Sequence, residues 1–221
     1  SRRQLWSLLE ALPAQKIATT NSGELLASVP LTSIRRLVRA ADRVRVHRID
    51  AAALTVEDRR RIAYHVLINR AGAMFARTWL LVEGETEAWL LPELARLHGL
   101  DFPAEGVRCI EYAQCGVRPL VRLATDLGIA WHLLADGDDA GRSYAAVARA
   151  MLAGAPERDH VTALEADDLE RCLWDAGYAH IYRAAAGPVA LRRREKPAAI
   201  IARAIHARSK PGLALEVVEA A

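Results

Sequence analysis

Buried-strand and helical patterns alternate through the middle of the chain. Continuous apolar runs predict strands at residues 79–82, 107–112, 129–135 and 160–164. Helical spacing of apolar positions predicts helices between and after them, at 85–98, 119–127, 142–152 and 168–174. Because strands that alternate with helices form parallel sheets with right-handed crossovers, we predict an α/β fold with a central parallel sheet flanked by helices.

The patterns outside this middle part favour helices. Before it we expect a helix at 2–12, a short β-type run at 16–20, a helix over 31–41 and an alternating run at 44–49. Thr55 followed by Asp58 resembles a capping box and predicts a helix over 55–75. After Gly177 we expect helices at 178–186, 197–207 and 213–218.

These patterns suggest three parts. We interpret residues 1–76 as a mostly helical lead-in and 77–177 as the α/β domain. Residues 178–221 should form C-terminal helices that pack with the lead-in as part of a mostly helical accessory domain.

Composition is that of a soluble protein. Of the 221 residues 52% are hydrophobic, enough for a core, and no apolar run reaches the roughly 18 residues that span a bilayer. No signal-peptide pattern opens the chain, and the three cysteines fit neither a disulfide framework nor a metal knuckle. We therefore predict a cytoplasmic protein without a membrane partner.

The net charge of +3 is too small to argue for nucleic acid by itself. Nearly all the positive charge is arginine, which binds phosphate bidentately, so the triplets at 59–61 and 192–194 suit a DNA backbone. The same triplets also suit solvated helix faces, and both interpretations stay open.

Candidate chemistry lies where two predicted strands end. Glu83 and Glu87 follow the first strand, and Asp136 and Asp138 follow the third. Because ligands bind outside the carboxyl ends of parallel strands, these carboxylates should meet at one rim. Hard divalent cations neutralise such clusters, and two of them can activate water against a phosphodiester. Either motif alone would more commonly be a cap or a surface feature, but together they favour a metal site.

The two motifs, VEGETE at 82–87 and DGDDAG at 136–141, resemble the TOPRIM domain of primases, topoisomerases and nucleases. The first motif, with DLERCLW at 168–174 and AIHARSKP at 204–211, is more similar to the class 2 branch of the OLD (overcoming lysogenization defect) endonucleases. The similarity covers roughly residues 55–221. It implies a Rossmann-like TOPRIM fold and a DNA endonuclease of low sequence specificity.

The resemblance also implies roles for individual residues. It implies two Mg²⁺ or Mn²⁺ ions, with Ca²⁺ able to occupy the site without full activity, and places Lys210 near the scissile phosphate. The implied metal ligands, direct or through water, are Glu83, Glu87, Asp136, Asp138 and Glu170. Alternatives remain: Glu165 is a rival to Glu170, Glu170 suits a helix N-terminus, and Lys210 suits a helix-joining turn. We expect Asp139 and Glu85 to face solvent or to support the ligands.

Residues 17–26 resemble the last strand and switch loop of an ABC-type ATPase, which precedes TOPRIM in OLD proteins. Asn21 stands where many relatives have histidine, and the chain has no GxxxxGK[ST] phosphate loop. We therefore expect an ATPase region upstream in a longer protein, and the sequence leaves open whether it forms a homodimer.

Two other functions remain. A different TOPRIM enzyme, of the primase or topoisomerase kind, is disfavoured because zinc-binding cysteines and a nucleophilic-tyrosine domain are missing from the sequence. A non-catalytic DNA-binding scaffold is disfavoured because both acidic motifs are intact.

Overall fold

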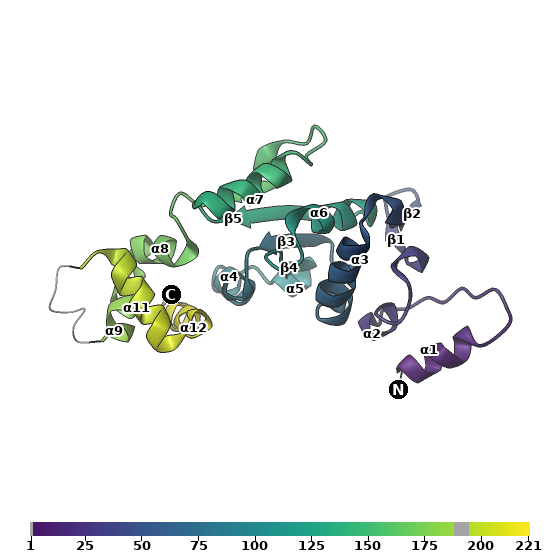
Figure 1. The fold of residues 1–221 in the computed structure, drawn as a ribbon, viewed down its shortest axis with the longest axis horizontal. Coiled ribbons are helices and arrows are strands. Elements are labelled where there is room, and N and C mark those ends of the chain that lie inside the picture. Colours follow the sequence, from purple (N-terminus) through teal and green to yellow (C-terminus); the bar gives the residue numbers. More distant parts are fainter. Residues whose placement is uncertain (1, 188–194) are drawn as a thin grey trace.

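The computed structural model describes residues 2–187 and 195–221 and has the predicted α/β fold (Figure 1). Its centre is a parallel sheet of four strands in the order β4-β3-β5-β6. Leu81 on β3 pairs with Ile110 on β4 and with Leu133 on β5, so the three strands run in register. The strands are β3 Thr78–Val82, β4 Val107–Glu111, β5 Ala130–Ala135 and β6 Val161–Ala163.

Helices cover both faces of this sheet, as the alternating pattern predicted. α6 and α7 pack together on β5 and β6, whereas α4 packs against β4 and α5. The main core lies between these layers, where Trp79, Leu81 and Leu133 are buried. The helices are α4 Glu85–Leu97, α5 Phe102–Glu105, α6 Val117–Asp126 and α7 Asp139–Arg149, and the short turn η5 Glu157–Asp159 precedes β6.

The lead-in differs from its prediction at two places. The expected helix at 31–41 is instead a short turn, η1 Leu31–Ser33, followed by strand β1 Arg35–Arg39. β1 pairs in antiparallel fashion with β2 Val44–Arg48, the run that was predicted to alternate. Leu37 and Val46 lie opposite each other, so cross-strand pairing overrides helix propensity here. Residues 16–20 have no regular structure, so the predicted β-type run there is wrong.

The β1–β2 hairpin is fixed to the main domain by Arg36. Its guanidinium donates to the carbonyls of Leu127 at 2.8 Å, Gly128 at 2.9 Å and Ala76 at 2.8 Å. Partial burial lowers the pKa of Arg36. The hairpin therefore packs on the C-terminal end of α6 rather than standing free.

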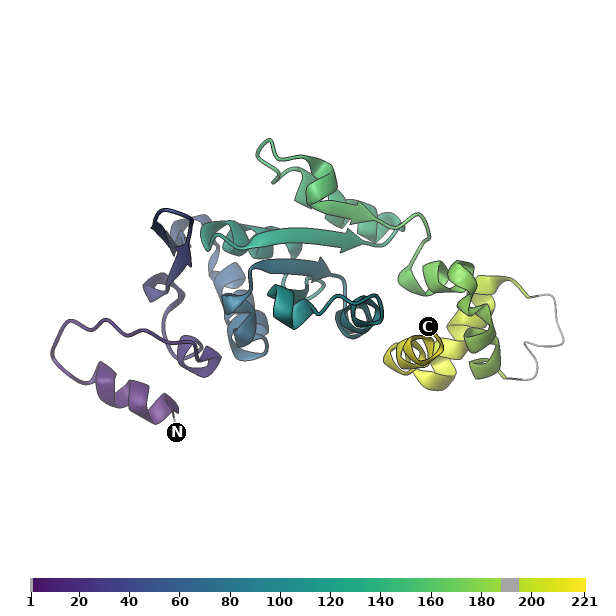
Figure 2. The same ribbon diagram turned by 180° about the vertical axis from the view of Figure 1, so that it is seen from behind.

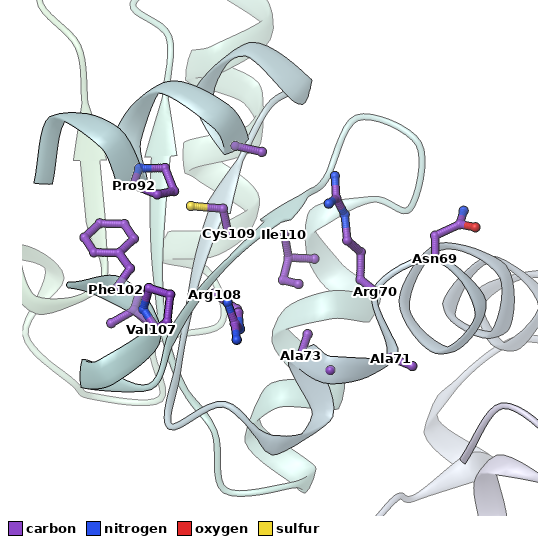
Figure 3. A pocket seen from close by; sticks show the side chains of 13 residues that line it. Asn69, Arg70, Ala71, Ala73, Pro92, Phe102, Val107, Arg108, Cys109 and Ile110 are labelled. Carbon is purple, nitrogen blue, oxygen red and sulfur yellow. The ribbon is translucent and has the colours of Figure 1, made fainter. Parts of the chain in front are cut away.

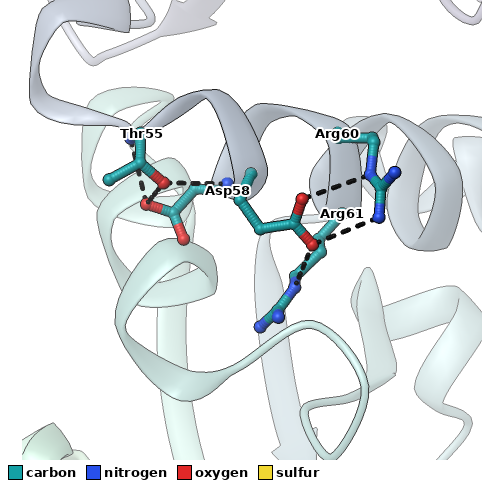
Figure 4. Close-up of polar contacts among 5 residues, drawn as sticks. Thr55, Asp58, Arg60 and Arg61 are labelled. Atoms are coloured by element: carbon teal, nitrogen blue, oxygen red, sulfur yellow. Dashed lines mark hydrogen bonds and ion pairs between the residues drawn. The ribbon is translucent and has the colours of Figure 1, made fainter.

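Only the first part of the helix expected at 55–75 is present: it changes from α- to π-type hydrogen bonding, ends at Ile68 and is separated by a break at residues 69–70 from a 3-10 turn. Thr55 caps its start, and its hydroxyl and the Asp58 carboxylate form the predicted capping box (Figure 4). In the same view Arg60 and Arg61 form ion pairs with Glu57, so these two arginines lie on a solvated helix face. The arginines at 192–194 lie outside the described residues. The segment is α3 Val56–Ile62, the π-helix η3 Ala63–Ile68 and the 3-10 turn η4 Ala71–Phe75.

Three further short elements complete the lead-in. α1 and α2 contact each other, and α2 also contacts η3 and η4. They are α1 Arg2–Glu10, α2 Gly23–Leu26 and η2 Ala51–Ala53.

The C-terminal helices form a second hydrophobic cluster, which Leu90 of α4 joins. α12 contacts α4, and the helices lie at the end of the molecule opposite the lead-in (Figures 1 and 2). The prediction that they pack with the lead-in is therefore wrong, because their apolar faces are buried against α4 and one another. The elements are α8 Leu169–Leu173, η6 Trp174–Tyr178, α9 Ala179–Ala185, α11 Pro197–Arg208 and α12 Lys210–Ala220. No helix of the described part of the chain is long and apolar enough to cross a bilayer.

Candidate metal centre

Glu83 and Glu87 lie at the carboxyl end of β3. Glu83 follows the last strand residue, and Glu87 is in the first turn of α4 with only 8% of its surface exposed. The Glu87 carboxylate accepts a hydrogen bond from the Gly84 amide at 2.9 Å through Oε2. This contact closes the turn between β3 and α4 and orients Glu87. One side-chain oxygen of Glu87 is therefore already engaged.

Asp136 and Asp138 occupy the loop between β5 and α7. Asp138 is exposed and caps α7, because its Oδ1 accepts from the Gly141 amide at 2.7 Å. Asp136 is half-buried beneath the same turn. A Cβ atom on Gly141 would lie 2.0 Å from the Asp136 carbonyl oxygen, so only glycine lets the helix start this close to the loop.

Glu170 and Lys210 come from the C-terminal helices. Glu170 lies in the first turn of α8, is 3% exposed, and forms an ion pair with the Lys210 ammonium at 2.9 Å. Lys210 is the first residue of α12 and its side chain is 46% exposed. Asp168 caps α8 by accepting from the Arg171 amide at 2.7 Å.

The charges of several of these groups act on the pKa of Glu83. Burial raises the pKa of Glu83, and the carboxylates of Asp138, Glu87 and Glu170 raise it further, while the Lys210 ammonium opposes them. In both ribbon views the carboxyl ends of β3 and β5 point toward the C-terminal helices (Figures 1 and 2). Charged groups of the sheet edge and of the helical part therefore both act on Glu83, and that they form one site stays a prediction.

Asp136 has the largest shift among the clustered carboxylates. Burial raises the pKa of Asp136 to about 7, and the charges of Glu83, Glu87, Asp168 and Glu170 act in the same direction. At neutral pH this carboxyl is therefore poised between its two protonation states, and a cation nearby would favour the charged form.

Burial and neighbouring charges act in opposite directions on the pKa of Lys210. Partial burial alone would lower the pKa of Lys210, but the hydrogen bond and the charge of Glu170 raise it above its ordinary value. The ammonium therefore stays charged at neutral pH beside the acidic cluster.

The residues fit a hard divalent cation by the chemistry of their donors. Glu83 Oε2 and Glu170 Oε2 are buried and have no hydrogen-bond partner among the described residues, which is costly for a carboxylate unless a cation or a water satisfies it. Oxygen donors of this kind are those that Mg²⁺ and Mn²⁺ prefer. However, no three carboxylate, histidine or cysteine side chains within residues 2–187 and 195–221 stand close enough to hold an ion as they are. Binding would require side-chain movement, and the ligand set stays a prediction.

Two family descriptions match consecutive parts of the chain. Residues 2–73 match "Protein of unknown function (DUF2813)". Residues 74–138 match "Overcoming lysogenization defect protein-like, TOPRIM domain". The chain contains an OLD-like TOPRIM domain. The predicted resemblance is thus confirmed, and the matched range includes Glu83, Glu87, Asp136 and Asp138, but neither Glu170 nor Lys210.

Solved structures confirm the fold around this TOPRIM domain. The C-terminal region of the Burkholderia pseudomallei OLD protein matches with a TM-score of 0.53 and 19% identity, over 66% of this chain and 89% of that one. The corresponding region of the Xanthomonas campestris pv. campestris OLD protein gives 0.51 and 19%, over 66% of this chain and 85% of that one.

A curated relative is much closer in sequence but longer. The "Uncharacterized protein YbjD" of Escherichia coli (strain K12) is 48% identical over 219 residues, which are 96% of this chain and 39% of that protein. This chain therefore spans about two fifths of the length of that relative.

Three residues join the cluster that the sequence did not single out as site residues. Asp168 entered the sequence analysis only as the first residue of the predicted helix at 168–174, yet its charge acts on Asp136 and on Lys210. Tyr112 is buried, with its hydroxyl 3.2 Å from the Leu134 carbonyl, and Tyr182 is also buried, with its pKa affected by the charge of Glu170. Burial raises the pKa of both phenols. In the sequence, the only pattern that could have indicated Asp168 as a site residue is its position two residues before Glu170. No pattern indicated the two tyrosines.

Two residues that the sequence proposed for lesser roles lie in solvent. Asp139 is fully exposed, one of the two placements expected for it, and it pairs with Arg142. Glu165, the rival to Glu170, is also exposed, whereas Glu170 is buried and paired with Lys210. The structure therefore favours Glu170 as the acidic residue of this segment.

The TOPRIM domain also has a cavity of about 320 Å³, which is separate from the acidic cluster. It lies beside β4, between α4, α5 and η4, and Figure 3 shows Arg108 and Cys109 on its wall. Its lining includes Arg70, which forms an ion pair with Glu111, and apolar groups such as Phe102. None of the predicted site residues lines this cavity, so the cavity does not mark the predicted metal site.

Proposed function

We propose that this chain carries the catalytic part of a divalent-metal-dependent DNA endonuclease that hydrolyses phosphodiester bonds. The observation that carries the proposal is that Glu83 and Glu170 each have a buried side-chain oxygen without a hydrogen-bond partner among the described residues, while both charges act on Asp136 and Lys210 pairs with Glu170. Such a cluster repels a DNA phosphate unless cations neutralise it. Two bound Mg²⁺ or Mn²⁺ ions would supply a nucleophilic water and stabilise the leaving oxygen.

The chain's own residues would share the work as follows. Glu83, Glu87 and Asp136 would hold cations at the sheet edge, and Glu170 would hold them from the opposite side. The Lys210 ammonium would offset the negative charge that develops on the phosphate. Asp138 has one oxygen in the cap of α7, which leaves Oδ2 for a cation or for a bound water.

The proposed DNA substrate rests on the family and on this charge arrangement, not on a shaped groove. Regulation by an upstream ATPase region, assembly into a homodimer and residence in the cytoplasm stay predictions from the sequence.

Cleavage of supercoiled plasmid tests the proposal. We expect nicked and linear products with Mg²⁺ or Mn²⁺, little product with Ca²⁺ and none with EDTA. Loss of products in Asp136→Ala would tie the activity to this cluster. If the plasmid stays intact with every metal while the protein still binds DNA, the chain is a non-catalytic TOPRIM scaffold. Cleavage that persists in Asp136→Ala would place the activity elsewhere.

A further inference from the structure

Glu170 is a buried charge that needs a positive partner. It is 3% exposed, and its Oε2 has no hydrogen-bond donor in the described structure. Its Oε1 lies 2.9 Å from the Lys210 ammonium. Because a buried carboxylate without a counter-charge is strongly destabilising, this ion pair supplies what a cation would otherwise supply.

The two partners differ in their freedom to move. Glu170 is fixed in the first turn of α8, whose start Asp168 caps and whose apolar residues Leu169 and Leu173 are buried. Lys210 has a flexible side chain that is 46% exposed. Its ammonium can leave Glu170 without displacing packed atoms, whereas the Glu170 carboxylate cannot leave its position.

The backbone before Lys210 is also unusual. Ser209 joins α11 to α12 with φ 67° and ψ 155°. Residues other than glycine rarely adopt a positive φ of this kind. The Ser209 hydroxyl accepts from the Gly212 amide at 3.4 Å and caps α12. This turn sets where α12 begins, and from there the Lys210 side chain reaches Glu170 on α8.

We propose that the Lys210 ammonium and a divalent cation compete for Glu170, so that loading the site with metal releases Lys210 toward the DNA phosphate. This inference rests on the proposed function of the same site. Glu170, one of the predicted ligands, is already held by the lysine in the described structure, so a cation would have to displace Lys210 to bind it. The competition also makes the transition-state lysine available only when the metal is in place.

Competition differs measurably from a supporting role. If Lys210 only held Glu170 in a ligand geometry, removing the ammonium would weaken metal binding. If Lys210 competes, removing it strengthens metal binding while it slows cleavage. The two roles therefore predict opposite signs for the same variant.

The test is a Mn²⁺ titration of the full chain without DNA, followed by electron paramagnetic resonance of free Mn²⁺. We expect Lys210→Met to lower the Mn²⁺ dissociation constant by at least about threefold, the size of one lost competing ion pair. Lys210→Arg keeps the pair and should bind Mn²⁺ no more tightly than the wild type. Lys196→Met, the same change at an exposed lysine, is the matched control and should leave binding unchanged.

Thermal unfolding adds a second measurement. Without metal, Lys210→Met leaves Glu170 uncompensated and should unfold at a lower temperature than the wild type, and Mn²⁺ should raise its melting temperature more than that of the wild type. If Lys210→Met is too unstable to titrate even with Mn²⁺, Lys210→Gln and Lys210→Arg are titrated instead. Tighter Mn²⁺ binding by Lys210→Gln than by the wild type supports competition, and equal or weaker binding overturns it.

The outcomes separate the inference from the function. Unchanged or weaker Mn²⁺ binding in Lys210→Met overturns the competition while leaving the nuclease intact. A wild type that binds no Mn²⁺ overturns the metal site itself, whereas a Glu170→Gln variant that binds it as well as the wild type removes Glu170 from the ligands and overturns the competition.

Discussion

The sheet edge of the TOPRIM domain and the C-terminal helices supply one acidic cluster in different ways. At the sheet edge, hydrogen bonds within each short loop set the positions, such as Glu87 to the Gly84 amide and Asp138 to the Gly141 amide. In the helical part, Glu170 and Lys210 lie on separate helices and meet only because α8, α11 and α12 pack together. The sheet half is thus defined locally, and the helical half depends on packing.

This difference has a consequence for catalysis. The strands β3 and β5 belong to one hydrophobic cluster, whereas α4, which carries Glu87, shares the other cluster with the C-terminal helices, so a shift between the clusters would change the opening of the site. Substitutions at the sheet edge should act on the chemistry directly, whereas substitutions in the helical half should act on metal binding and stability as well.

The largest effect is expected for the sheet half. Asp136→Asn removes the charge of the carboxylate on which Glu83, Glu87, Asp168 and Glu170 all act, and should slow plasmid cleavage by about 10³-fold. Asp139→Asn is the matched control in the same loop and should change the rate by less than about twofold, because Asp139 is exposed. Equal losses in both variants would mean that the loop, not the Asp136 charge, matters.

The second-largest loss of cleavage is expected for a substitution in the helical half. Lys210→Met removes the charge that offsets the phosphate and should slow cleavage by about 10²-fold at saturating Mn²⁺. Single-turnover rates with a nicked product as readout separate this loss from any change in metal affinity. A rate like that of the wild type at saturating metal would remove Lys210 from the chemistry.

A glycine tests the local definition of the sheet half. In Gly141→Ala the new Cβ would overlap the Asp136 carbonyl, so the loop must shift, at a cost of about 1–3 kcal/mol in the free energy of unfolding. Cleavage should fall by about tenfold because Asp136 moves. Gly72→Ala, where no atom lies within 4 Å of the added Cβ, should leave both stability and cleavage unchanged. Full cleavage in Gly141→Ala would show that the loop position is not critical.

The smallest effect concerns pH. Because burial raises the pKa of Asp136 to about 7, the fold favours the protonated carboxyl, and that stability is lost as pH rises from about 4 through 7. In EDTA, Asp136→Asn should therefore gain stability over the wild type between pH 5 and 8. After allowance for partial exposure, we expect a melting-temperature difference of about 2–6 °C at pH 8. Differential scanning fluorimetry measures it, and a difference that does not grow with pH would contradict the shift.

The sequence predicted the sheet half well because its signals are local. The apolar run before Glu83 and the one before Asp136 gave β3 and β5 within one residue of their observed bounds. The glycine-rich loops also indicated where the backbone turns. Periodicity and turn chemistry act over a few residues, so they can be read without the fold.

The features that the sequence did not predict depend on contacts between residues that are far apart in the chain. Residues 35–39 form a strand because they pair with 44–48, although their composition suited a helix. The π-helix at 63–68 and the approach of Tyr112 and Tyr182 to the cluster also depend on tertiary packing. Glu170 and Lys210 were singled out by family resemblance, and their ion pair became visible only in the folded chain.

The central claim is that both regions contribute to one metal site, and a double-mutant cycle of Mn²⁺ affinity tests it most directly. The variants are Asp136→Asn, Glu170→Gln and their combination, each titrated with Mn²⁺ in the absence of DNA. Residues that share a site give non-additive losses, so we predict that each single variant weakens binding and that the combined loss differs clearly from the sum of the two. Unchanged binding in Glu170→Gln, or strictly additive losses, would mean that the helical region is not part of the site.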